Sequence, residues 1–176
     1  YFAFQLDTTV TLYYDRGESG SYELFGLDYL RPDVYVKAGR FVPSYGWKFD
    51  DHTMFVRSEL GFMPPGHSDV GLEAGATHGP VDLQLGVVNG SRGQILDTDT
   101  RAAGVGSALY RRRVGPASAA LGISGYHQPG DSRDFDTWGL YGYFTWNRFT
   151  WVGEGDYFQS RPAGGPATIG AVTSHE

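Results

Sequence analysis

The chain has 176 residues, enough for one domain, and no cysteine, which excludes a disulfide framework, a cysteine-ligated metal site and covalently attached haem. Its net charge of −6 argues against a basic surface that could bind nucleic-acid phosphates, so we expect no nucleic-acid partner. No run of about 18 apolar residues occurs, so no transmembrane helix is expected.

Amphipathic strand candidates follow one another along the whole chain. In chain order they are Tyr1–Tyr14, Tyr22–Leu30, Val34–Val42, Asp69–Thr77, Val81–Val88, Arg101–Arg111, Ala117–His127, Thr137–Trp146, Phe149–Gln159 and a short piece after Ala167. Connections between them alternate in length. The long ones are 15–21, 43–68, 89–100 and 128–136, and the short ones are 31–33, 78–80, 112–116 and 147–148. Long loops on one rim and tight turns on the other are typical of an up-and-down barrel in a bacterial outer membrane.

Each strand candidate has an apolar and a polar face, because side chains alternate with a period of two. In 81–88, for example, Val81, Leu83, Leu85 and Val87 point opposite to Asp82 and Gln84. A soluble barrel or sandwich would show the same alternation with its apolar face inward. Two observations favour the membrane: most candidates are longer than the 5–6 residues common in soluble strands, and aromatic residues lie near strand ends, as an interfacial belt requires. These aromatic residues are Trp138, Trp146, Phe149, Trp151, Tyr157 and Phe158.

Short motifs over residues 34–90 resemble a known family. The segment 36–46 reads VKAGRFVPSYG, and it is followed by DDHT at 50–53, Arg57, LGF at 60–62, GLEAG at 71–75 and VNG at 88–90. This pattern is similar to bacterial outer-membrane porin-type barrels, a group often encoded near multihaem cytochromes and loosely like phosphate-selective porins. The resemblance implies a passive pore and, as a partner, either a multihaem cytochrome or none.

The expected fold is therefore all-β: an antiparallel up-and-down transmembrane β-barrel formed by residues 1–176. Barrels of this family usually have many more than the roughly ten strands found here, and the chain begins and ends inside strand candidates. We therefore expect a fragment of a larger barrel in the bacterial outer membrane, in contact with the lipid bilayer and lipopolysaccharide.

The segment 43–68 is too long for a simple turn and is rich in charged residues. In wide barrels such a loop folds inward, where rings of charge select ions. We therefore expect constriction residues at Arg40, Asp50, Asp51, His52 and Arg57. Alternatively, residues 51–53 form a hydrogen-bonded corner that holds the loop against the wall. Adjacent residues of an extended chain point to opposite sides, so we expect no metal site there.

Other charged residues have two interpretations each. The run 111–113, three arginines beside a turn, fits either a contact with lipopolysaccharide or solvated residues at a membrane rim. Glu154 and Asp156 either tune a lumen toward cations or form wall salt bridges with Arg101 or Lys37.

The function expected from the sequence is a porin-like channel for passive passage of small hydrophilic solutes or ions. One alternative is a barrel that sheathes a multihaem cytochrome in an electron conduit. A second is a small lipid-modifying outer-membrane enzyme, but Ser124, His127, Ser132 and His52 lie in no recognisable catalytic motif. We therefore expect no enzymatic activity and no cofactor.

Overall fold

The structure is a computed structural model that describes residues 2–16, 22–47, 68–90, 101–130, 133–162 and 168–175. Eleven strands occur in these ranges, and none of the described residues forms a helix long and apolar enough to cross a membrane. The strands are β1 (Phe2–Gln5), β2 (Val10–Arg16), β3 (Tyr22–Arg31), β4 (Val34–Phe41), β5 (Asp69–His78), β6 (Val81–Val88), β7 (Ala103–Val114), β8 (Ala117–Gln128), β9 (Arg133–Trp146), β10 (Phe149–Pro162) and β11 (Thr168–His175).

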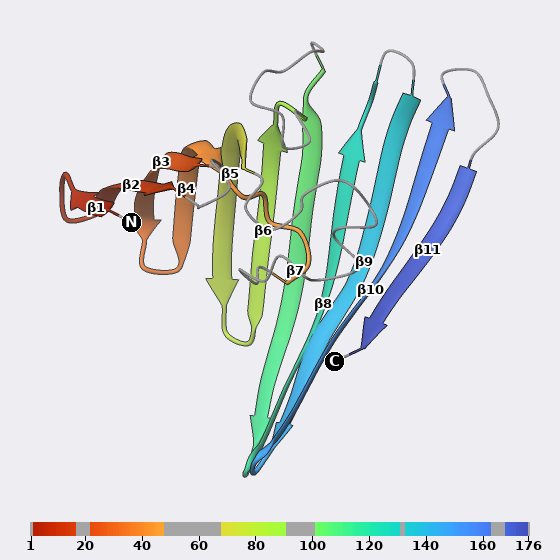
Figure 1. The fold of residues 1–176 in the computed structure, drawn as a ribbon. Helices are drawn as coiled ribbons and strands as arrows, with labels where there is room; N and C mark the ends of the chain where they lie inside the picture. Colours follow the sequence, from red (N-terminus) through yellow and green to blue (C-terminus); the bar gives the residue numbers. More distant parts are fainter. Residues whose placement is uncertain are drawn as a thin grey trace.

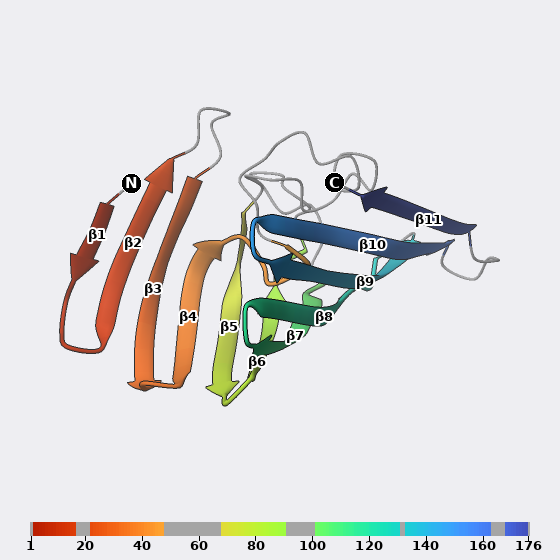
Figure 2. The ribbon, with the colours of Figure 1, turned by 90° about the horizontal axis from the view of Figure 1, so that it is seen from below.

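The strands form one antiparallel sheet in which each strand pairs with the next along the chain. The expected all-β, up-and-down arrangement is thereby confirmed. The sheet is strongly curved but not closed: β1 and β11 are its two edges and stand well apart (Figures 1 and 2). Strands β7 to β10 have 12 to 14 residues and extend far beyond the ends of their neighbours (Figure 1).

Tight turns gather at one end of the sheet, as the connection lengths predict. Residues 32–33, 79–80, 115–116 and 147–148 form two-residue turns at the lower end in Figure 1. We call the opposite end, where β6, β8 and β10 finish, the long-loop end. Gly79 (φ 55°), Gly115 (φ 58°) and Asn147 (φ 51°) adopt the left-handed conformation there. Glycine and asparagine tolerate this conformation better than other residues, which explains why these residues stand in the turns.

The predicted first strand, 1–14, is wrong in one respect: it is a hairpin of β1 and β2. Leu6 and Asp7 donate backbone hydrogen bonds to the Val10 carbonyl, and the Asp7 carboxylate accepts a hydrogen bond from the Thr8 amide. The alternation hides this turn because even-numbered residues pair with even-numbered ones, such as Phe4 with Leu12. The apolar set therefore stays on one face through the turn.

Other strands extend beyond the predicted bounds. Strand β7 continues through the three arginines at 111–113, β9 begins at Arg133 rather than Thr137, and β10 continues to Pro162 rather than Gln159. Partners across the sheet account for the extension of β7, since residues 112–114 pair with residues 117–119 of β8. Just before them, Arg111 forms a salt bridge of 2.8 Å with Asp82 on β6. At the start of β9, the Gly130 amide donates to the Asp134 carboxylate.

The two faces of the sheet differ in chemistry. We call the concave face the inner face; its residues align in register across the strands, for example Lys37, Glu73, Gly86, Val105, Tyr126 and Thr137. Toward the long-loop end, a small buried cluster covers this face, formed by Phe41, Tyr45, Val88, Ala103, Val105, Tyr126 and Phe135. The remainder of the inner face is largely polar.

Candidate functional site

The outer face of the sheet is apolar and exposed. Its large side chains include Leu72, Leu83, Leu85, Val87, Leu121, Ile123, Trp138, Leu140, Phe144, Trp146 and Trp151, which are 48–71% exposed. The buried polar side chains lie instead on the inner face or at its long-loop end, and include Lys37, Glu73, Ser124, Gln128, Thr137, Glu154 and Asp156. This distribution is the reverse of that in a water-soluble protein, which buries its apolar side chains.

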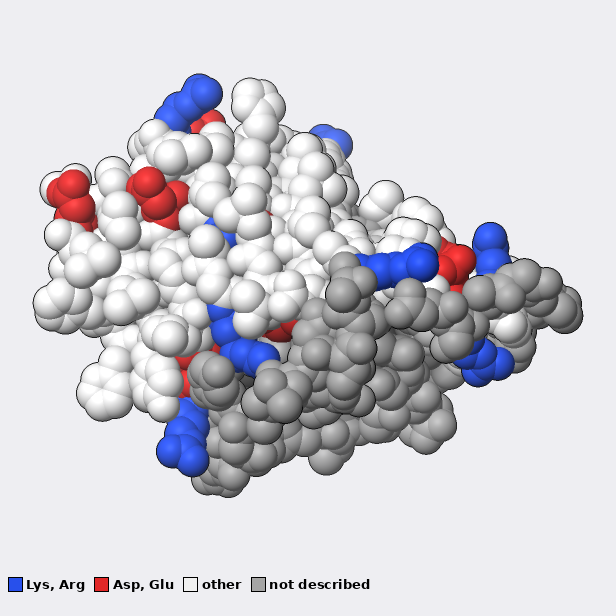
Figure 3. Space-filling view, turned by 90° about the horizontal axis from the view of Figure 1, so that it is seen from above, with Lys and Arg blue, Asp and Glu red and all other residues white. Residues whose placement is uncertain are grey.

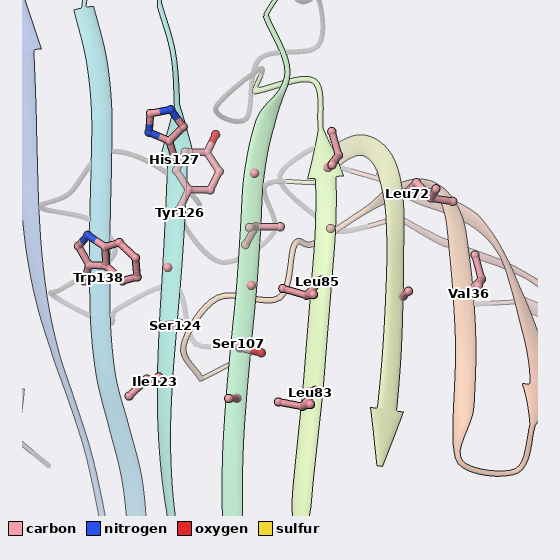
Figure 4. A pocket seen from close by; sticks show the side chains of 18 residues that line it. Val36, Leu72, Leu83, Leu85, Ser107, Ile123, Ser124, Tyr126, His127 and Trp138 are labelled. Carbon is pink, nitrogen blue, oxygen red and sulfur yellow. The ribbon is translucent and has the colours of Figure 1, made fainter. Parts of the chain in front are cut away.

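A broad apolar groove runs along the outer face over the glycines of β7. Leu83 and Leu85 border it on one side, and Ile123 and Trp138 border it on the other (Figure 4). Its volume is about 740 Å³. Contiguous exposed apolar surface of this kind marks contact with a membrane or with another protein.

Polar and aromatic residues bound the apolar surface at its two ends. On β8 and β9, the His127 ring and the Asp136 carboxylate form an outer-face hydrogen bond of 2.6 Å at the long-loop end. At the turn end, Trp146 and Phe149 pair across the two-residue turn between β9 and β10. In the view from above, charged side chains form small scattered groups separated by uncharged surface (Figure 3).

Residues 42–47, which follow β4, lie against the inner face of the sheet. We call them the inner segment; the end of the orange trace in Figure 1 marks them. Residues 43–45 are buried, and Tyr45 belongs to the buried cluster. The segment begins at β4 yet bonds to β10 on the far part of the sheet, so it crosses the concave surface.

Glu73 on β5 joins the inner segment to the wall. Its carboxylate forms a salt bridge of 2.8 Å with the Lys37 ammonium and accepts hydrogen bonds from the Tyr35 hydroxyl (2.9 Å) and the Ser44 hydroxyl (2.5 Å). The Lys37 Nζ atom also lies 4.2 Å from the centre of the Phe41 ring, in cation–π geometry. Glu73 is completely buried, so these partners replace the water that its charge has lost.

The far end of the inner segment is held by β10. The Tyr45 hydroxyl donates a hydrogen bond of 2.6 Å to the Asp156 carboxylate, and the Trp47 indole N–H donates to the Gly153 carbonyl at 3.3 Å. Gly139 on β9 leaves the space for the first contact, since a Cβ there would collide with Asp156. A side chain at position 139 would therefore have to displace the Asp156 carboxylate and the Ser124 hydroxyl.

A cavity of about 420 Å³ lies on the inner face beside Trp47. The aromatic side chains that line it are Tyr35, Trp47 and Tyr141, and the polar ones are Thr77, Asp82, Gln84 and Ser107. The rings of Trp47 and Tyr141 are in edge-to-face contact with centres 5.1 Å apart. This volume lies within the range of about 300–1,000 Å³ common for small-molecule sites.

Four of the five expected constriction residues, Asp50, Asp51, His52 and Arg57, lie outside the described residues. The fifth, Arg40, lies near the end of β4, where it pairs with Leu24 and Val70 of the outer face. Its guanidinium donates a hydrogen bond of 2.9 Å to the Ser68 carbonyl. Arg40 thus links the end of β4 to Ser68, the residue just before β5.

The carboxylates of Glu154 and Asp156 on β10, for which the sequence predicted a lumen-facing or wall role, face the concave side of the sheet. Glu154 and Asp156 are each 4% exposed. The salt-bridge partner of Lys37, however, is Glu73, which the sequence analysis did not propose. Phe158 also differs from expectation: it stacks on Phe135 of the inner face, with ring centres 6.0 Å apart, and is not part of an outer aromatic belt.

Sequence reasoning missed the roles of Tyr35, Ser44, Tyr45 and Trp47. One signal was available, since the inner segment contains two aromatic residues and a proline in what would otherwise be a solvated loop. Among the described residues, no three histidine, aspartate or glutamate side chains gather in a way that could hold a metal ion.

Comparison of the chain with protein-family models, with curated proteins and with solved structures found no match. The functional interpretation therefore depends on the geometry of the sheet and on the chemistry of its two faces.

Proposed function

We propose that this chain forms part of the wall of a transmembrane β-barrel that acts as a porin-like channel for small hydrophilic solutes or ions. One observation supports the proposal above all: ionisable side chains such as Lys37, Glu73 and Asp156 are buried on the concave face, while large apolar side chains are exposed on the convex face. A lipid environment makes this favourable, because the apolar face then contacts hydrocarbon and the polar face lines a lumen.

The height of the apolar band agrees with a membrane. On β9 the outward side chains from Trp138 to Trp146 are Trp138, Leu140, Phe144 and Trp146, with Gly142 between them. At about 3.4 Å per residue this distance is about 27 Å along the strand. A strand tilt of about 40° reduces it to about 21 Å across the membrane, near the roughly 25 Å band of outer-membrane barrels. Asp136 lies just outside the band, where a polar headgroup region begins.

A channel also requires that the sheet close. Both edges, β1 and β11, would otherwise leave backbone groups unpaired in lipid, which costs several kcal/mol for each group. Closure by further strands would satisfy these groups and would give a lumen wide enough to hold the inner segment without being filled. In this arrangement the inner segment narrows the lumen along the wall formed by β4, β5, β9 and β10.

Reconstitution in planar lipid bilayers tests this function. We expect extraction from membranes to require detergent, and we expect the purified protein to produce stepwise ion conductance when it is added to the bilayer. Tyr45→Phe and Trp47→Ala, which release the inner segment, should change the size of the steps, whereas Tyr110→Phe on the outer face should not. Extraction with buffer alone, or the absence of conductance, would contradict the channel. Absence of conductance together with a co-purifying haem protein would instead support the cytochrome sheath.

A further inference from the structure

We propose that the inner-face cavity beside Trp47 is a binding subsite for a neutral, ring-shaped polyol of the sugar class. The proposal rests on the proposed channel function, because it names the solute that the lumen would favour. The cavity lies on the face assigned to the lumen, next to the inner segment that narrows it.

Hydrogen-bonding groups along one side of the cavity suit a row of hydroxyls. Gln84 and Ser107 are neighbours on β6 and β7, and the Ser107 hydroxyl donates to the Gln84 side-chain oxygen at 3.2 Å. Thr77 and Asp82 add a hydroxyl and a carboxylate at 2.7 Å from each other. Amide, hydroxyl and carboxylate groups together offer donors and acceptors, as sugar hydroxyls require, since each hydroxyl both donates and accepts.

Aromatic rings provide the complementary apolar surface. Tyr35, Trp47 and Tyr141 come from β4, the inner segment and β9 and line the same cavity. The C–H bonds on a face of a pyranose ring carry a small positive charge, and the face of an aromatic ring is negative. A cyclic sugar therefore places its C–H face on a ring and its hydroxyl edge on Gln84 and Ser107. An open-chain polyol has the hydroxyls but lacks the flat apolar face.

The charges at the cavity argue for a neutral solute rather than an ion. Asp82 is the one carboxylate among the described lining residues, and it forms a salt bridge of 2.8 Å with Arg111. The pair carries no net charge, so the Asp82 carboxylate itself offers a cation little attraction. The volume of about 420 Å³ also exceeds what a bare ion needs and suits a small organic solute.

Maltose is a suitable probe, with the open-chain polyol sorbitol as its comparison at equal concentration. We expect maltose to reduce the ion current through the reconstituted protein in a saturable manner, and sorbitol to reduce it much less. In Gln84→Met, the maltose concentration for half-maximal block should rise about tenfold, the effect of one lost hydrogen bond. Gln5→Met makes the same chemical change on β1, away from the cavity, and should leave the block unchanged.

The channel and the polyol subsite fail in different ways. If the protein conducts but maltose has no more effect than sorbitol, or if Gln84→Met and Gln5→Met behave alike, the subsite is overturned while the channel stands. If the protein does not conduct, the channel fails, and binding is measured directly in detergent. For that purpose Trp138, Trp146 and Trp151 are replaced by phenylalanine, so that Trp47 alone reports fluorescence. A saturable response to maltose would support the subsite, and no response would overturn it.

Discussion

Replacing Leu85 with lysine tests whether the outer face of the sheet contacts lipid or water. Leu85 lies in the middle of β6 on the outer face, between Ala74 of β5 and Gly106 of β7, and it is 71% exposed. In water, replacement of such an exposed side chain changes the free energy of unfolding by no more than about 0.5 kcal/mol. In a membrane, the same change brings a charge into hydrocarbon.

The expected magnitude follows from the depth of the residue in the bilayer. Lysine near the midplane of a membrane β-barrel costs about 2–4 kcal/mol, and lysine near an interface costs about 0–1 kcal/mol. At 1.36 kcal/mol for each factor of ten, Leu85→Lys lowers the folding equilibrium constant about 30-fold to nearly 1,000-fold. Val114 is the matched control: it is 64% exposed and ends β7 beside the turn at Gly115. For Val114→Lys we expect at most about 1 kcal/mol.

The assay is reversible urea unfolding of both variants and the parent protein in phospholipid vesicles, followed by tryptophan fluorescence. Three of the four tryptophans, Trp138, Trp146 and Trp151, are exposed on the outer face and report the loss of the lipid environment. If Leu85→Lys destabilises the protein no more than Val114→Lys does, the outer face does not lie in hydrocarbon, and the proposed orientation is wrong.

Three further predictions concern buried contacts and one turn, each measured by the same unfolding assay. Tyr45→Phe removes the hydroxyl that donates to the Asp156 carboxylate, and we expect a loss of about 1.5–3 kcal/mol; no change would mean that the inner segment is not docked. Glu73→Gln leaves the Lys37 ammonium buried without its counter-charge, at a cost of about 3–5 kcal/mol, and adding Lys37→Met should recover part of it. Asn147→Gly should be nearly neutral, whereas Asn147→Ala should cost about 1–2 kcal/mol because of the positive φ; equal effects would contradict the turn geometry.

The order and pairing of the strands could be predicted because the signals are local. Alternation with a period of two identifies strands, and residues such as Gly79, Gly115 and Asn147 mark two-residue turns. Short connections then make consecutive strands antiparallel neighbours. The hairpin of β1 and β2 was missed because its turn keeps the apolar residues on one face, so the pattern does not change there.

The candidate site could be predicted only in part. Inward orientation of Glu154 and Asp156 follows from alternation along a single strand, and the structure confirms it. The partners could not be predicted in the same way. The Tyr45–Asp156 bond joins residues 111 positions apart, and the Ser44–Glu73 bond joins residues 29 apart. No local pattern encodes these contacts, since they depend on how the curved sheet brings β5 and β10 beneath the inner segment.

The sequence by itself determined that each strand has an apolar and a polar face, because backbone geometry alone sends alternate side chains to opposite sides. It also determined where the two-residue turns lie, as at Gly79, Gly115 and Asn147. Only the tertiary structure decided which face is concave, because curvature arises from the pairing and twist of all the strands together. That curvature encloses Glu73 and Asp156 and leaves Leu85 and Trp138 on the convex side. The same alternating sequence, curved the other way, would have buried its leucines as a water-soluble protein does.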